Sequence, residues 1–254
     1  MPPCTMHGHG PNHVIAIHGW FNDSAAFDAM LAGFDPERFT IALPDLRGYG
    51  LRRGVGGPYD IATMAEDVLM IADALDWQRF SVIGHSMGGK AALKVALTAP
   101  ERVERLVGIT PVWAGEAPFD EGTRAFFRSA ANDPAARQAI LDTTTGERLP
   151  TTWLKACAER SVAVSDKEAY AAYFESWSGD DFGEAASTIA TPVLVIAGAH
   201  DWGIPEDLLR ATWLSQLPQA RLVVMPEAGH YPMDECPLAL ARQIVAFLEP
   251  ELAR

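Results

Sequence analysis

The chain has 254 residues, of which 48% are hydrophobic and 21% are charged. This length and composition suit one α/β domain with a full hydrophobic core, and they exclude an intrinsically disordered protein. The 20 basic and 33 acidic residues give a net charge of −13 at pH 7, which argues against a surface that binds nucleic acid.

Cysteine usage and the N-terminus predict a cytoplasmic protein. The three cysteines, Cys4, Cys157 and Cys236, have wide and unrelated spacings, so we expect neither a disulfide framework nor a metal-ligand cluster. The first ten residues lack the basic start and apolar run of a signal peptide. No stretch approaches the roughly 20 apolar residues that span a bilayer. The sequence therefore predicts no membrane partner, no metal and no cofactor, and it makes no prediction of oligomeric state.

Short apolar runs alternate with helical patterns, which is typical of a parallel sheet covered by helices. The runs are almost continuously apolar, as expected of strands buried on both faces. We expect an α/β fold with a mostly parallel sheet of about six strands, preceded by a mobile tail that contains His7 and His9. The predicted strands cover residues 13–17, 39–43, 80–83, 103–109, 193–197 and 220–225, and the predicted helices cover residues 24–32, 61–75, 90–97, 206–217 and 238–248.

The alternation stops between residues 112 and 188, where the pattern is helical and rich in aromatic residues. An insertion after the strand near residue 109 lies at the edge of the sheet where ligands bind, so we interpret it as a helical lid. The core then comprises residues 1–111 and 189–254. Alternatively, the aromatic side chains only pack the segment onto the core. Ten of the 23 aromatic residues lie in it: Trp113, Phe119, Phe126, Phe127, Trp153, Tyr170, Tyr173, Phe174, Trp177 and Phe182.

A glycine-flanked serine follows the predicted strand at residues 80–83. The pattern Gly84-x-Ser86-x-Gly88 lies between this strand and a predicted helix, which is the context of a strained strand-to-helix turn that exposes a nucleophilic hydroxyl. The helix N-terminus beside it offers free N–H groups to a developing oxyanion. A plain glycine-rich turn is the alternative interpretation.

A serine nucleophile needs a base, and the base needs an acid that orients it. His230 follows the last predicted strand, in a loop at the same sheet edge as Ser86, and is the candidate base rather than a surface-loop histidine. Asp201 follows the strand at 193–197 and is the candidate acid. Glu206 and Asp207 lie nearby but open the next helix, where a carboxylate stabilises the N-terminus. The order nucleophile, acid, base is the one used by this architecture.

An oxyanion hole needs two N–H donors. The Met87 amide, directly after the serine, is one candidate, and the Trp20 amide, in the loop after the first predicted strand, is the other. Gly19 allows close backbone approach there, and His18 is expected to brace the loops by hydrogen bonding. An ordinary strand-ending turn is the alternative.

Two further sets of residues are candidates for substrate contact. Trp113 and Trp177 are candidate pocket walls in the aromatic insertion. The pair Arg52-Arg53 could meet a substrate carboxylate, although solvated loop charges are the favoured interpretation.

Together these motifs resemble the α/β-hydrolase fold superfamily, and within it they are similar to small bacterial serine esterases, perhydrolases, enol-lactonases and C–C bond hydrolases. The resemblance implies an acyl-enzyme on Ser86, with His230 as base and then acid and Asp201 holding the imidazole. The usual fold opens with a β-hairpin. Only about 12 residues precede the first predicted strand, so we expect the sheet to lack these edge strands. The matching motifs are His18-Gly19-Trp20, Pro44-Asp45-Leu46-Arg47-Gly48-Tyr49-Gly50, Gly84-His85-Ser86-Met87-Gly88-Gly89, Ala199-His200-Asp201 and Gly229-His230.

The expected activity is hydrolysis of a carboxylic ester or lactone of a small, largely apolar substrate. A C–C bond hydrolase of the meta-cleavage-product type and a perhydrolase are alternatives on the same triad. A ligand-binding receptor on the same fold is the non-enzymatic alternative.

Overall fold

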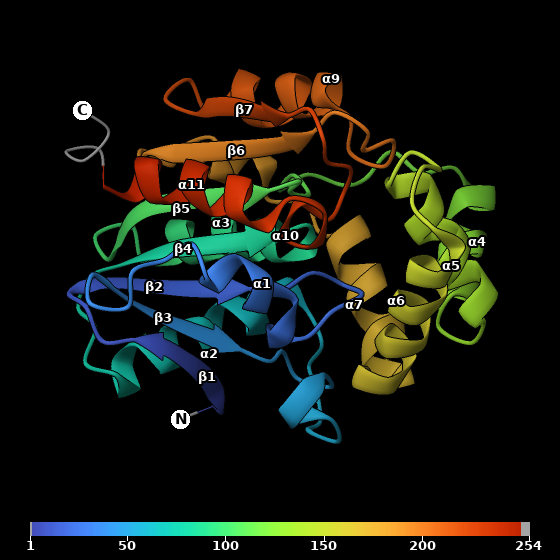
Figure 1. Ribbon diagram of the computed structural model, residues 1–254, viewed down its shortest axis with the longest axis horizontal. Coiled ribbons are helices and arrows are strands. Elements are labelled where there is room, and N and C mark those ends of the chain that lie inside the picture. The colour runs from blue at the N-terminus through green and yellow to red at the C-terminus, as the bar shows by residue number, and fades with distance from the viewer. Residues whose placement is uncertain (1, 250–254) are drawn as a thin grey trace.

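A seven-stranded sheet forms the centre of the protein, whose computed structural model describes residues 2–249 (Figure 1). The strand order is β1-β3-β2-β4-β5-β6-β7. The pair β1–β3 is antiparallel and the other neighbouring pairs are parallel. The predicted mostly parallel α/β sheet is thereby confirmed. The strands are β1 Cys4–Gly8, β2 Asn12–Ile17, β3 Phe39–Pro44, β4 Phe80–His85, β5 Val103–Ile109, β6 Val193–Gly198 and β7 Arg221–Met225.

The strand β1 corrects two expectations. Residues 4–8 form an edge strand that pairs in register from Cys4 with Pro44 to Gly8 with Thr40, so this part of the chain is not a tail. The sheet therefore has seven strands rather than about six, with a single antiparallel strand at its edge in place of a hairpin. An edge strand pairs on one side only, so it needs no continuous apolar run. Its partly exposed side chains carry little strand signal.

Helices cover both faces of the sheet. In Figure 1, α1, α10 and α11 lie on the face toward the viewer, and α2 and α3 lie together behind it. The strands between them are buried on both faces, with Ile15, Val82 and Val195 fully inaccessible. None of the helices within residues 2–249 combines the length and hydropathy needed to cross a membrane. The helices of these layers are α1 Asp28–Leu31, α2 Ile61–Ala74, α3 Met87–Thr98, α9 Glu206–Leu209, α10 Pro232–Glu235 and α11 Pro237–Leu248.

Five helices connect β5 to β6. Four of them, α4 to α7, stand beyond the end of the sheet toward which the parallel strands point (Figure 1). Contacts of α4 with α5 and α7, and of α5 with α6, connect these four helices, and α7 also contacts α2. We call residues 112–188 the inserted segment. Its helices are α4 Glu121–Ser129, α5 Pro134–Thr144, α6 Thr151–Val164, α7 Lys167–Gly179 and α8 Gly183–Ala186.

Candidate active site

Ser86 occupies a strained turn between β4 and α3. Its backbone has φ 52° and ψ −116°, a conformation that a side-chain-bearing residue adopts only when its surroundings impose it. The flanking glycines are required by close packing. A Cβ on Gly84 would lie 2.1 Å from the Gly88 carbonyl oxygen, and a Cβ on Gly88 would lie 2.3 Å from the Ile17 carbonyl oxygen. The turn places the Ser86 hydroxyl in the wall of a pocket.

His230 and Asp201 are hydrogen-bonded to each other at the same edge of the sheet. His230 lies in the loop between β7 and α10, and its Nδ1 is 2.6 Å from Asp201 Oδ2. The other carboxylate oxygen, Oδ1, accepts the amides of Gly203 and Ile204, both at 2.9 Å. Both members of the pair are buried. Because a carboxylate only accepts hydrogen bonds, Nδ1 carries a proton, and in the neutral imidazole Nε2 then has the free lone pair.

The main chain of His230 is held from two sides. Its amide donates to the carbonyl oxygen of Thr144, the last residue of α5, at 3.0 Å. Its carbonyl oxygen accepts from His85 Nε2 at 2.9 Å and from Thr110 Oγ1 at 3.0 Å. The loop is therefore attached both to the inserted segment and to the ends of β4 and β5.

The amides of Met87 and Trp20 are free donors near the serine turn. Met87 opens α3, so its N–H has no partner inside the helix. Among residues 2–249 neither amide has a hydrogen-bond acceptor. The Trp20 carbonyl oxygen accepts from the Tyr49 hydroxyl at 2.8 Å, and its indole N–H donates to the Tyr170 carbonyl oxygen at 2.7 Å. These two bonds fix the loop and leave the Trp20 amide available.

His18 holds this loop through hydrogen bonds at both of its ring nitrogens. Its Nδ1 donates to the Gly19 carbonyl oxygen at 2.9 Å, and its Nε2 accepts the Leu46 amide at 3.1 Å. Burial lowers the pKa of His18, against the hydrogen bond to Gly19 and the nearby carboxylates, which raise it. Both ring nitrogens are therefore occupied in the neutral form.

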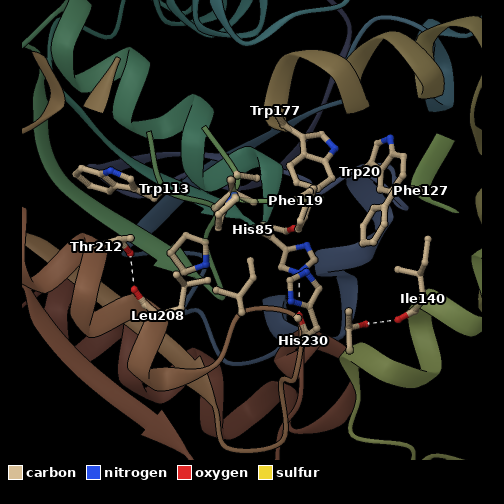
Figure 2. Close-up of a pocket in the computed structure, with 18 of the residues that line it drawn as sticks. Trp20, His85, Trp113, Phe119, Phe127, Ile140, Trp177, Leu208, Thr212 and His230 are labelled. Carbon is tan, nitrogen blue, oxygen red and sulfur yellow. Dashed lines mark hydrogen bonds between the residues drawn. The ribbon is translucent and has the colours of Figure 1, made fainter. Parts of the chain in front are cut away.

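Ser86, His85 and His230 line a pocket of about 150 Å³ between the core and the inserted segment (Figure 2). Trp113 and Trp177 both lie in its wall. Most of the other lining residues were not predicted to face a pocket, because helical periodicity does not show which aromatic side chains face the core. They include Phe21, Pro111, Val112, Phe119, Phe127, Ile140, Ile204, Leu208 and Tyr231.

The pocket is nearly free of charge. Glu116, the one Asp, Glu, Lys or Arg among its lining residues, is 2.8 Å from Arg124 in an ion pair. No group of three or more His, Cys, Asp or Glu side chains within residues 2–249 is arranged to hold a metal ion. Ser86 and His230 lie in this lining, together with two groups that have no hydrogen-bond partner among the described residues, the Trp177 indole N–H and His85 Nδ1.

Neither Arg52 nor Arg53 lines the pocket. Arg53 is half-exposed and pairs with Asp166 at 3.3 Å. The expectation of a solvated charge is wrong for Arg52, which is buried and lies 2.7 Å from Asp67 on α2. The reason is tertiary, because α2 presents a carboxylate that also binds Arg47 at 2.9 Å.

Lys90 links the serine helix to the inserted segment, a role that sequence analysis missed. It is fully buried one helical turn after Ser86. Its ammonium donates to the carbonyl oxygens of Gly115, Trp177 and Asp180. Burial lowers the pKa of Lys90 to about 8, although nearby carboxylates raise it.

Comparisons with known proteins agree with this architecture. A family model described as the alpha/beta hydrolase fold matches residues 12–237. A pimeloyl-[acyl-carrier protein] methyl ester esterase from Nitrosomonas europaea is 30% identical over 243 residues, which cover 91% of this chain and 92% of that protein.

Solved structures share the fold over almost the whole chain. The enol-lactonase from Burkholderia xenovorans LB400 is 26% identical with a TM-score of 0.84, covering 97% of this chain and 95% of that one. An esterase from Exiguobacterium antarcticum is 20% identical with a TM-score of 0.87, covering 97% and 94%. At that identity the esterase supports the fold alone.

Proposed function

The chain belongs to the α/β-hydrolase fold family, and on that premise we propose that it is a serine hydrolase that cleaves a carboxylic ester or a lactone. The observation that carries the proposal is the His230–Asp201 hydrogen bond of 2.6 Å beside a pocket whose wall contains the strained Ser86. A hydroxyl, an imidazole with a free Nε2 and a buried carboxylate are the groups that acyl transfer needs.

In the proposed mechanism, Ser86 Oγ attacks the carbonyl carbon of the substrate while His230 Nε2 takes the hydroxyl proton. Asp201 keeps the second imidazole proton on Nδ1 and stabilises the imidazolium that forms. The amides of Met87 and Trp20 stabilise the oxyanion of the tetrahedral intermediate, a role that is supported by their having no acceptor among residues 2–249.

Collapse of this intermediate expels the alcohol, which takes the proton from His230, and leaves an acyl-enzyme on Ser86. A water molecule then loses a proton to His230 and attacks the acyl carbon. The second tetrahedral intermediate then collapses and releases the carboxylic acid, while His230 returns its proton to Ser86 Oγ. With a lactone the alcohol and the acid belong to one product.

The pocket supports a small, uncharged and largely apolar substrate. Its lining offers no unpaired cation to a substrate carboxylate, since Glu116 is its only Asp, Glu, Lys or Arg residue. The names of two similar proteins, a methyl ester esterase and an enol-lactonase, fit the ester and lactone classes. A panel of neutral esters, their anionic half-esters and lactones tests this class. If the protein hydrolysed a meta-cleavage product faster than every ester, the activity would instead be C–C bond hydrolysis.

We also propose that the inserted segment acts as a lid on a core of residues 1–111 and 189–254. Trp113 and Trp177 lie in the pocket wall on the side of this segment and would contact the bound substrate. This proposal is supported by the position of α4 to α7 beyond the carboxyl ends of the parallel strands (Figure 1).

The test of the proposed function is Ser86→Ala, assayed on a p-nitrophenyl ester and with a fluorophosphonate probe. We expect kcat to fall about 10⁴-fold or more and labelling to disappear, while circular dichroism stays unchanged. The matched control is Ser129→Ala, which removes a hydroxyl from the exposed end of α4 and should change neither readout. Wild-type turnover in Ser86→Ala would overturn the assignment.

A further inference from the structure

His85 joins the loops that carry the candidate catalytic groups. It ends β4 directly before Ser86, and its side chain is fully buried. Figure 2 shows its ring beside that of His230, and the two ring centroids are 5.1 Å apart. Its Nε2 is 2.9 Å from the His230 carbonyl oxygen. Because a carbonyl oxygen only accepts, Nε2 carries the proton and His85 is the donor.

The His230 carbonyl oxygen receives two donors from the sheet. Thr110 Oγ1 donates to it at 3.0 Å from the residue after β5, and His85 donates from the end of β4. The Thr110 amide in turn donates to the Ile196 carbonyl oxygen of β6 at 2.7 Å. The main chain of the base is thus fixed relative to the strand that carries the nucleophile.

The opposite edge of the His85 ring packs against the loop that contains Gly19 and Trp20. A Cβ on Gly19 would lie only 2.5 Å from His85 Nδ1, so the ring packs directly on the turn that precedes Trp20. His85 Nδ1 is buried and has no hydrogen-bond partner within residues 2–249. The position of the His85 ring is therefore determined by packing against Gly19 on one side and by the Nε2 hydrogen bond on the other.

We propose that His85 is a positioning residue for hydrolysis, which sets His230 and the Trp20 loop in register with Ser86. This inference rests on the proposed function. His85 exchanges no proton, because Nε2 is committed to the carbonyl oxygen. Burial, followed by the neighbouring His230, lowers the pKa of His85 well below its ordinary value, so the ring stays neutral and the bond is independent of pH.

The experiment compares His85→Gln with His85→Asn. The amide nitrogen of glutamine reaches the place of Nε2 and can donate to the same carbonyl oxygen, whereas that of asparagine stops near the place of Nδ1. We expect His85→Asn to lower kcat about 10- to 100-fold, as misplacement of reacting groups does. KM should change little, and His85→Gln should recover most of kcat. Fluorophosphonate labelling of Ser86 should slow in parallel with kcat.

The pH profile and a second variant separate positioning from stability. The proposal predicts that the apparent pKa of kcat/KM shifts in His85→Asn and returns in His85→Gln, which a general loss of stability would not produce. Thr110→Val, which removes the other donor, should also lower kcat, and it keeps the test open if His85→Asn does not fold. Equal kcat in both His85 variants, or wild-type kcat in His85→Asn, overturns the proposal. Failure of the proposed function appears instead as unlabelled Ser86 in the wild type.

Discussion

Replacing Asp201 by asparagine should leave the geometry of the site in place and reverse the tautomer of His230. Asp201 Oδ1 accepts two backbone amides, from Gly203 and Ile204. An asparagine at this position must put its amide oxygen there, because its NH₂ group would meet two donors. The NH₂ group then faces His230 Nδ1, which has to accept. The imidazole proton moves to Nε2, and the base can no longer take the proton of Ser86.

The expected loss follows from the two interactions that disappear. A hydrogen bond to a charged group contributes about 1.5–3 kcal/mol. The imidazolium that forms in the transition state loses a buried counter-charge, which adds roughly 3 kcal/mol at the effective dielectric of a protein. The sum of about 5 kcal/mol corresponds to a 10³- to 10⁴-fold fall in kcat. KM should change little, because Asp201 does not line the pocket.

Steady-state hydrolysis of a p-nitrophenyl ester measures this effect, with thermal unfolding as the check on folding. The matched control is Asp207→Asn, which removes an exposed carboxylate in the first turn of α9 and should leave kcat unchanged. If Asp201→Asn keeps kcat within tenfold of the wild type, the tautomer argument fails. An equal loss in both variants would also contradict it.

Two further predictions concern buried charges outside the reacting groups. Burial holds the pKa of Lys90 at about 8, whereas its ordinary value in an unfolded chain is 10.5, so the unfolded chain binds more protons between pH 8 and 10.5. The free energy of unfolding should therefore rise by up to about 3 kcal/mol more in the wild type than in Lys90→Met as pH increases from 8 to 10.5, measured by urea unfolding. An identical pH dependence in both proteins would refute this. Burial raises the pKa of Asp67, but hydrogen bonds from Arg47 and Arg52 outweigh it and lower the pKa overall. Its stabilisation is present above pH 3.8 and is lost as pH falls through the lower folded-state pKa. Asp67→Asn should thus lower the free energy of unfolding by about 3 kcal/mol at pH 7, measured by urea unfolding, and should weaken its fall at acid pH. Unchanged stability at pH 7 would contradict this prediction.

Local sequence patterns were sufficient for the features that depend on neighbours in the chain. The serine turn could be predicted because its three small residues and its flanking strand and helix lie within a dozen positions. The buried central strands could be predicted from their continuous apolar runs. The fold class, which follows from their alternation with helices, was confirmed by the structure and by the family model.

Features that depend on distant partners could not be predicted. The strand β1 carries little apolar signal because β3 pairs with it on one side only. Arg52 looks like an ordinary loop charge until α2 places Asp67 beside it. His85 adjoins Ser86 in the sequence, yet its bond to the His230 carbonyl oxygen spans 145 residues. No spacing rule relates two such positions.

If the inserted segment is the lid proposed above, the hydrogen bond from the His230 amide to the Thr144 carbonyl oxygen would couple its opening to the position of the proposed base. Thr144 ends α5, so an outward movement that carried this end of the helix away would break the bond of 3.0 Å. An open protein would then admit substrate with its imidazole loosely held, and closure would restore the aim of the ring as it expels water. One closing movement would thus both exclude water and position the imidazole. Water that entered an open pocket would find the imidazole out of position to activate it.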